Sequence, residues 1–358
     1  MLTLLLLILI LGALIFIHEL GHFLVAKKSG VYIYEFSLGM GPKLIGHKGK
    51  DGINYNLRLL PIGGFVQMAG EVYEDDNKIP KEDFMCNKPW HQRIAIILAG
   101  VTNNFLLALL LLFIMGLIWG VNSTKPVIGT IVKDSPMDKA GIKVDDTIVS
   151  INGYKTKSWD KAALVLQYKN DKDYYTIEVK DKNDLKTTHK VYPEEKKDKE
   201  GKKSNYFGFA IKQTTYHGIG ASIKYAFIKF GLIIEQMCLV IINLFNGNLS
   251  LSALSGPVGM YSIVETTAAA GVYSVIYLVA LLSINLGFIN VLPFPAFDGG
   301  RALFMIIEKI KGSPVNQKIE NTCHTVGFIL LMILMIFITI QDVLNLFWQN
   351  INLIVLCI

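Results

Sequence analysis

The chain has 358 residues, of which 52% are hydrophobic and 18% are charged, and its formal net charge is +6. Soluble proteins carry about 25% charged residues, so the composition excludes an ordinary soluble protein and predicts a polytopic membrane protein with one soluble insertion. The small, dispersed positive charge argues against nucleic-acid binding and fits membrane orientation. The four cysteines have no C-x-x-C spacing, which predicts neither a thiolate metal site nor a disulfide framework.

Four apolar segments are long enough to cross a bilayer, which takes about 20 helical residues. They lie at 1–26, 94–119, 272–300 and 323–347. The first lacks a basic start and a small-residue cleavage site, so we expect a retained span rather than a cleaved signal. The sequence therefore predicts an α-helical membrane protein with about four transmembrane helices.

The connecting segments differ in character. Lys and Arg are frequent in 27–93 and in the 301–322 loop, so both are expected in the cytoplasm. Within the first of these, the alternation INYNLRLL at 53–60 predicts a strand, and hence a small membrane-associated β-region. The 219–271 segment begins with either an interfacial or a partly inserted helix, and both alternatives stay open. Residues 348–358 are expected to form a C-terminal tail.

The long 120–218 segment is expected to be one compact domain outside the cytoplasm. Its candidate strands are 127–132, 147–153 and 174–180, and its candidate helix is 159–168. The charge run EEKKDKEGKK at 194–203 is expected to be a solvated loop.

The first span contains the unusual sequence HELGH. His18 and His22 are four residues apart and share one helix face, with Glu19 beside them, which is the H-E-x-x-H arrangement of zinc hydrolases. A catalytic zinc takes three protein ligands and keeps a fourth position for water. Each ionisable group within a span costs about 2.5 kcal/mol or more, and metal coordination compensates for this cost. The alternative is hydrogen bonding between helices.

The strongest candidate for a third ligand is Asp298, in NVLPFPAFDGGR at 290–301. Two prolines and two glycines break the helix there, and irregular backbone at membrane depth is tolerated where protein or water satisfies it. The alternative role of Asp298 is a helix N-cap. Weaker ligand candidates are His324, Glu265 and Asp342. Asn285 and Asn290 could hydrogen-bond a substrate backbone or serve as contacts between helices.

Several motifs occur in an order that resembles a known family. They are HELGH, GMG at 39–41, LPIGGFVQM at 60–68, LAGVTNNF at 98–105, SGPVGM at 255–260 and NVLPFPAFDGG at 290–300. Together they resemble the bacterial site-2 proteases, the RseP/RasP-type intramembrane zinc metalloproteases of peptidase family M50. The resemblance covers nearly the whole chain.

The resemblance implies a zinc metalloendopeptidase in which His18, His22 and Asp298 bind Zn²⁺ and Glu19 is the general base. It also implies a set of substrate-binding residues, namely Asn285, Asn290, Pro293, Pro295, Asn104, Gly39 and Gly41. It further implies that 120–218 is a PDZ domain. The expected location is the bacterial cell membrane, with the active site near the cytoplasmic side.

The resemblance implies single-span membrane proteins as substrates, such as an anti-sigma factor or signal-peptide remnants, and a preceding cut by another protease. Such a substrate must unwind, and pairing with an edge strand replaces its lost hydrogen bonds; 53–60 is the candidate edge. Departures from the family pattern at Phe297, Met40 and Val101 bear on substrate preference. A scaffold without catalysis and a metal transporter are the rival functions.

Overall fold

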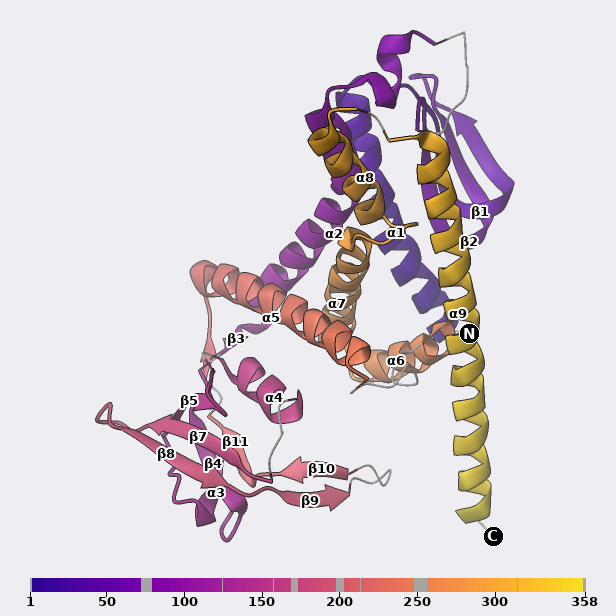
Figure 1. Ribbon diagram of the computed structural model, residues 1–358. Coiled ribbons are helices and arrows are strands. Elements are labelled where there is room, and N and C mark those ends of the chain that lie inside the picture. The colour runs from indigo at the N-terminus through magenta and orange to yellow at the C-terminus, as the bar shows by residue number, and fades with distance from the viewer. Residues whose placement is uncertain are drawn as a thin grey trace. The chain divides into compact units, whose positions relative to one another are not determined.

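The computed structural model describes residues 2–71, 79–123, 125–156, 158–168, 173–197, 203–212, 214–247, 256–313 and 315–356 (Figure 1). The chain divides into two compact units. The first comprises 1–112 and 233–358, and the second comprises 113–232.

Long helices form most of the first unit, and two of them continue into the second. The helices outside the soluble insertion are α1 (Leu2–Lys28), α2 (Trp90–Trp119), α5 (Ile219–Phe245), α6 (Pro257–Ala269), α7 (Val272–Val291), α8 (Asp298–Lys311) and α9 (Gln317–Leu356). Among the described residues, five helices are long and apolar enough to cross a membrane, namely α1, α2, α5, α7 and α9. Four of them coincide with the predicted spans, and α5 is the segment that the sequence left open.

Two predicted boundaries are wrong. The 301–322 loop begins as α8, because apolar residues recur on one face of DGGRALFMIIEKIK until Gly312, whose φ of 75° ends the helix. The expected 348–358 tail continues α9 as far as residue 356, and the last two residues lie outside the described part. Apolar residues in 351–356 allow the helix to extend past the predicted span.

The membrane-associated β-region is a hairpin of β1 (Ile33–Lys48) and β2 (Asn54–Met68), in which each strand pairs twice. Residues 54–57 pair with 35–38 on one side and with 45–48 on the other. The prediction that 53–60 provides the edge is therefore wrong, because this strand is interior. Residues 64–68 pair only with 33–38 among the described strands, so they form an edge.

A bend in β1 makes this double pairing possible. Gly39 and Gly41 have φ values of 88° and 83°, which residues with a Cβ rarely adopt. The Arg58 guanidinium holds the bend by donating to the Gly41 carbonyl at 2.8 Å and by pairing with Glu35 at 2.6 Å. Burial would raise the pKa of the Glu35 carboxyl, but hydrogen bonds from Asn56 and Arg58 outweigh it, and the pKa is lowered.

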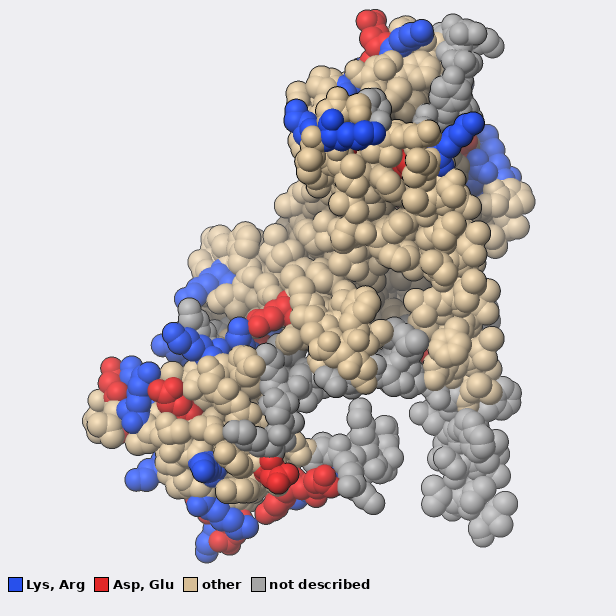
Figure 2. Space-filling model, in the orientation of Figure 1, with Lys and Arg blue, Asp and Glu red and all other residues tan. Residues whose placement is uncertain are grey.

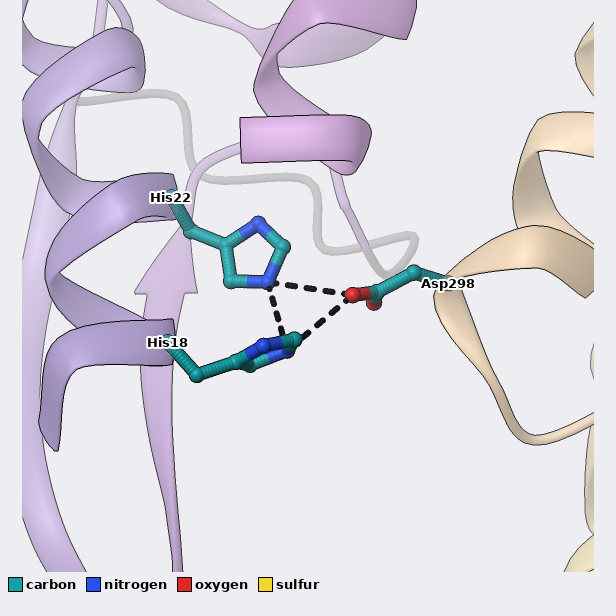
Figure 3. Close-up of side chains that lie close together, drawn as sticks. All are labelled: His18, His22 and Asp298. Carbon is teal, nitrogen blue, oxygen red and sulfur yellow. Dashed lines mark hydrogen bonds and ion pairs between the residues drawn. The ribbon is translucent and has the colours of Figure 1, made fainter. Parts of the chain in front are cut away.

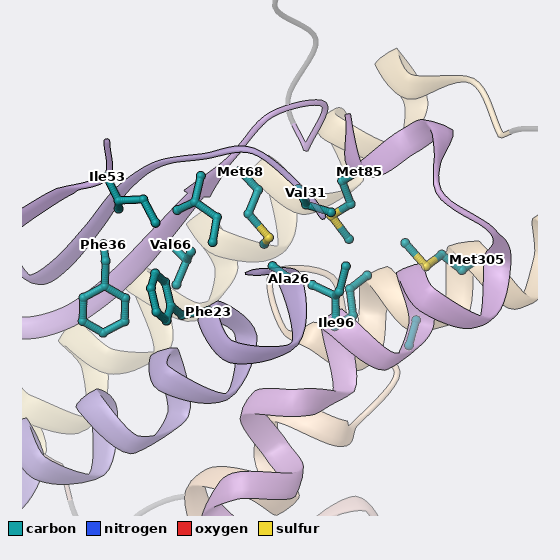
Figure 4. Packing of buried hydrophobic residues seen from close by; sticks show 13 residues of the cluster. Phe23, Ala26, Val31, Phe36, Ile53, Val66, Met68, Met85, Ile96 and Met305 are labelled. Carbon is teal, nitrogen blue, oxygen red and sulfur yellow. The ribbon is translucent and has the colours of Figure 1, made fainter. Parts of the chain in front are cut away.

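Buried apolar side chains join this hairpin to three helices (Figure 4). Phe23 of α1 stacks edge-on against Phe36 of β1, with ring centroids 5.2 Å apart. Val66 of β2, Ile96 of α2 and Met305 of α8 belong to the same cluster. The cluster therefore fixes the hairpin beside the second half of α1, where HELGH lies.

The second unit contains the predicted soluble domain. Its main sheet has the order β6-β5-β7-β8, and its elements are β3 (Val121–Asn122), β4 (Ile128–Ile131), α3 (Pro136–Lys139), β5 (Thr147–Ile151), β6 (Tyr154–Lys155), α4 (Trp159–Tyr168), β7 (Tyr175–Lys180), β8 (Lys186–Val191), β9 (Glu194–Lys197), β10 (Lys203–Tyr206), β11 (Phe209–Ile211) and β12 (Thr215–Tyr216). The three predicted strands and the predicted helix are confirmed. The start of the charge run is not a loop, because β9 pairs with β10.

The first part of α5 contacts this domain. Lys229 pairs with Asp160 of α4 at 2.6 Å, and both side chains are half-buried. A lysine held by a soluble domain is expected at an interface rather than in lipid. This contact favours the interfacial alternative for that part of α5, which stays a prediction.

Charge is unevenly distributed over the first unit. Figure 2 shows a broad uncharged surface over its helices, with Lys and Arg gathered toward the end that carries the hairpin and the end of α8. Such a surface fits a segment in contact with lipid, flanked by a basic face.

Polar contacts fasten α8 to α2 at this end. Arg93 donates to both carboxylate oxygens of Glu308, at 2.7 and 3.1 Å, and the Trp90 indole donates to the Met305 carbonyl at 2.9 Å. The Arg93 and Glu308 side chains are only 17% and 22% exposed. A bidentate pair with this little solvent screening orients the two helices.

We expect Glu308→Ala to lower the midpoint of thermal unfolding in detergent, because it leaves Arg93 half-buried without its partner. The loss should be about 1–3 kcal/mol. The exposed Glu82→Ala is the control and should leave the midpoint unchanged. If the double variant Arg93→Met/Glu308→Ala lost the sum of the two single effects, the pair would not be coupled.

Candidate metal centre

Three side chains from distant parts of the chain converge within the first unit (Figure 3). His18 and His22 project from α1, and Asp298 is the first residue of α8. The two Nε2 atoms are 3.2 Å apart, and Asp298 Oδ2 lies 3.1 Å from His18 Nε2 and 3.3 Å from His22 Nε2. Both histidines are buried, at 7% and 8% exposure.

These distances match a tetrahedral metal site. Ligand atoms about 2.0 Å from a zinc ion in tetrahedral geometry are about 3.3 Å from one another. Within the described residues, no other group of His, Cys, Asp or Glu side chains comes together in this way. The three residues present therefore fit a metal ion and leave a fourth position for water.

The hydrogen-bond partners of the two imidazoles are compatible with metal binding. The His22 ring donates through Nδ1 to the Ile96 carbonyl at 2.8 Å, so in the neutral imidazole Nε2 carries a lone pair. That lone pair faces the Asp298 carboxylate, which also offers only lone pairs. Acceptors that converge without a donor repel one another, and a cation among them relieves the repulsion, either a metal ion or a proton on one imidazole.

His18 is oriented by Asn104 of α2, whose carboxamide lies 3.1 Å from His18 Nδ1 and is fully buried. Asn104 Oδ1 has no hydrogen-bond partner in the described part of the chain. If the Asn104 amide is rotated by 180°, its Oδ1 accepts a hydrogen bond from His18 Nδ1–H. His18 Nε2 then carries the lone pair that can bind a metal. Ser283 of α7 fixes Asn104 by donating to its backbone carbonyl at 2.8 Å.

Glu19 lies beside the site without a fixed partner. Its side chain is half-buried and makes no hydrogen bond or ion pair with any described residue. The edge strand passes close to it, since a Cβ added to Gly64 would lie 3.0 Å from Glu19 Cγ. A carboxylate without a partner, next to a metal site, is available to exchange protons.

The loop between α7 and α8 places Asp298. Pro293 and Pro295 exclude a continuous helix, and α7 ends at Val291. The N-cap residue of α8 is Phe297, and no side-chain hydrogen bond caps the helix there. The alternative role of Asp298 as an N-cap is therefore not observed, because its carboxylate faces the two imidazoles instead.

The other predicted site residues are distributed around this centre. Asn285 and Asn290 lie on α7, half-buried, and their side chains make no hydrogen bond to the described chain. Gly39 and Gly41 lie in the bend of β1. Two weaker ligand candidates have other partners: His324 accepts from the Ala296 N–H at 2.9 Å, and Asp342 accepts from the Gly259 N–H at 2.8 Å.

Two glycines let the helices approach the site, and the sequence reasoning assigned neither a role. A Cβ on Gly21 of α1 would overlap the Ala99 carbonyl of α2. A Cβ on Gly100 of α2 would overlap His22 Nε2 and lie 2.8 Å from His18 Nε2. Gly100 lies in LAGVTNNF at 98–105, and this motif is the only sequence signal for its position.

Comparison with known proteins finds a matching family and several similar proteins. The model of Peptidase family M50 matches residues 6–334. The chain is 33% identical to the regulator of sigma-W protease RasP of Bacillus subtilis, covering 95% of this chain and 98% of that protein. It is 36% identical to a putative zinc metalloprotease of Clostridium acetobutylicum, over 94% and 96% of the two chains. A putative zinc metalloprotease of Fusobacterium nucleatum is 35% identical, over 96% and 99%.

We expect Gly100→Ala to abolish stoichiometric zinc binding, because the added methyl group occupies the space beside the two Nε2 atoms. Zinc in the purified protein is measured by elemental analysis, and folding by thermal unfolding in detergent. Gly12→Ala is the matched control, since a Cβ there meets nothing within 4 Å. Full zinc occupancy in Gly100→Ala would contradict this geometry.

Proposed function

The chain belongs to peptidase family M50 and is a zinc metalloprotease, and on this premise we propose that it cleaves single-span membrane proteins within their transmembrane segments. The observation that carries the proposal is the convergence of His18, His22 and Asp298 next to an unpartnered Glu19. The two histidines lie in a helix apolar enough to span a membrane. Such groups are expensive in lipid and mark function there.

We propose that His18, His22 and Asp298 hold Zn²⁺. A bound zinc ion polarises a carbonyl group and lowers the pKa of a bound water to about 7. Asn104 and the Ile96 carbonyl keep the two imidazoles in the tautomer that ligation needs.

Glu19 is proposed as the general base. Its carboxylate takes a proton from the attacking water and then delivers that proton to the leaving amine. The absence of a competing hydrogen bond from the described residues supports this role, because the carboxylate oxygens stay available to the water.

The substrate is proposed to bind as an extended strand along residues 64–68. A helical segment satisfies its own backbone and is closed to attack, so it must unwind before cleavage. The edge beside Glu19 offers backbone groups that replace the lost hydrogen bonds. The unpartnered amides of Asn285 and Asn290 are proposed to hydrogen-bond the peptide, while Pro293 and Pro295 keep the facing loop open.

The remaining assignments follow from the family and the charge pattern. We infer a multi-pass bacterial cell-membrane protein whose active site lies toward the cytoplasm, since Lys27 and Lys28 end α1 on the side of the metal centre. Gly39 and Gly41 shape the substrate-binding sheet. The 120–218 domain is proposed as a PDZ domain that restricts access to substrates already shortened by another protease, with an anti-sigma factor or a signal-peptide remnant as the substrate.

Glu19→Gln should lower cleavage of a tagged single-span substrate in liposomes by about 10²–10⁴-fold, because the amide cannot accept the proton. Zinc content should stay at the wild-type level, since Glu19 is not a ligand. Glu265, one of the weaker ligand candidates, is exposed on α6 and lies outside the cluster of His18, His22 and Asp298, so Glu265→Gln is the control and should cleave normally. Cleavage at the wild-type rate by Glu19→Gln would exclude this base, and a wild-type protein without zinc would exclude the ligand set.

Gly64→Ala should reduce the cleavage rate about tenfold while zinc binding persists, because the methyl group would crowd the Glu19 side chain, 3.0 Å away, and Ile15. Gly12→Ala again serves as the control. Unchanged cleavage by Gly64→Ala would contradict a role for this strand next to the base.

A further inference from the structure

Helix α9 contacts the loop that precedes Asp298 at two points and α8 at a third. The His324 imidazole accepts a hydrogen bond through Nδ1 from the Ala296 backbone N–H at 2.9 Å. One turn further, Gly327 lets the helix lie directly on Pro295, because a Cβ there would lie 2.7 Å from Pro295 Cβ. The His324 ring also packs against Phe304 of α8, with centroids 5.7 Å apart.

The residue that His324 holds has an unusual backbone. Ala296 has a φ of 84°, in the left-handed region that a Cβ disfavours. Such a conformation persists only where its surroundings determine it. His324 accepts a hydrogen bond from the N–H of Ala296, and the neighbouring Pro295 lies against Gly327. The turn therefore depends on α9.

The His324 ring is suited to its contact with Ala296 through its hydrogen-bond acceptor, Nδ1, rather than through its apolar surface. With Nδ1 accepting, the neutral imidazole carries its proton on Nε2. That Nε2 is buried and finds no hydrogen-bond partner among the residues described. A purely apolar packing role would be served better by leucine, which leaves no polar atom unsatisfied. His324 thus maintains one buried unsatisfied group in order to accept from Ala296.

The turn is close to the metal centre. Asp298 follows Ala296 by two residues, and its carboxylate must reach both imidazoles from the first position of α8. Gly299 and Gly300 pack against the carbonyls of Leu292 and Phe294, so the loop has little room to compensate for a change at Ala296. Rotation of the Ala296 peptide would therefore move Asp298.

We propose that His324 is a positioning residue, which holds Ala296 in its left-handed conformation and so sets the Asp298 carboxylate for metal binding. The inference rests on the proposed role of Asp298 as a ligand. In this inference α9 helps to position the Asp298 carboxylate. It acts through the backbone of Ala296 and does not contact the metal or the substrate.

The test compares His324→Leu with His324→Asn in the full-length protein in detergent. Asn Oδ1 is attached to Cγ as His Nδ1 is, so it can accept the same hydrogen bond, whereas Leu cannot. Zinc affinity, measured by competition with a chromophoric chelator, should fall about 10–100-fold in His324→Leu and stay near wild type in His324→Asn. The kcat should fall with the affinity while KM changes little. Val326→Leu, at an exposed position of α9, is the control.

A second variant separates positioning from general packing. Ala296→Gly removes the cost of the left-handed conformation, so Ala296→Gly/His324→Leu should recover most of the zinc affinity that His324→Leu loses. A purely structural effect of His324 would not be rescued in this way.

The outcomes distinguish this inference from the proposed function. Equal zinc affinity in His324→Leu and wild type would overturn the positioning role and leave the ligand set intact. Equal losses in His324→Leu and His324→Asn, or no recovery in the double variant, would also overturn it. A wild-type protein that binds no zinc would instead overturn the ligand assignment on which both rest.

Discussion

Three lone-pair-bearing atoms face one another in a buried site, and the rest of the first unit is arranged around them. His18, His22 and Asp298 meet at 3.1–3.3 Å, and while both imidazoles are neutral with Nε2 unprotonated no donor lies between them and the carboxylate. In a medium of low polarity this repulsion is offset by a cation among the three atoms, either a metal ion or a proton on one imidazole. Each surrounding contact can be understood as holding these three groups together.

The three groups are held together because α1 and α2 approach each other closely. Gly21 and Gly100 bring α1 and α2 within backbone contact, so that Asn104 and the Ile96 carbonyl reach the two rings. Arg93 and Trp90 fasten α8 to the same helix, which carries the aspartate to the other side of the site. Small residues let membrane helices pack in the absence of a hydrophobic driving force between them.

Sequence alone located four of the five long apolar helices and the helical HELGH segment, because hydropathy and a spacing of four along a helix are local signals. It named Asp298 from the break in the helix at Pro293 and Pro295. It placed a strand at 53–60 but assigned it to an edge, since the double pairing that makes this strand interior depends on the bend at Gly39 and Gly41. It assigned 301–322 to a loop, because Lys and Arg residues indicate the cytoplasmic side and do not report the apolar face of α8. Contacts such as that of Gly100 with His22 join distant segments, so no local pattern reveals them.

The three groups of the candidate metal centre lie far apart in the chain, and this order has a consequence for shortened forms of the protein. His18 and His22 lie in α1, whereas Asp298 begins α8 and the loop before it is contacted by α9. A chain that ends before Asp298 keeps both imidazoles in an apolar helix and lacks the carboxylate that faces them, so two polar groups would be left there without that partner.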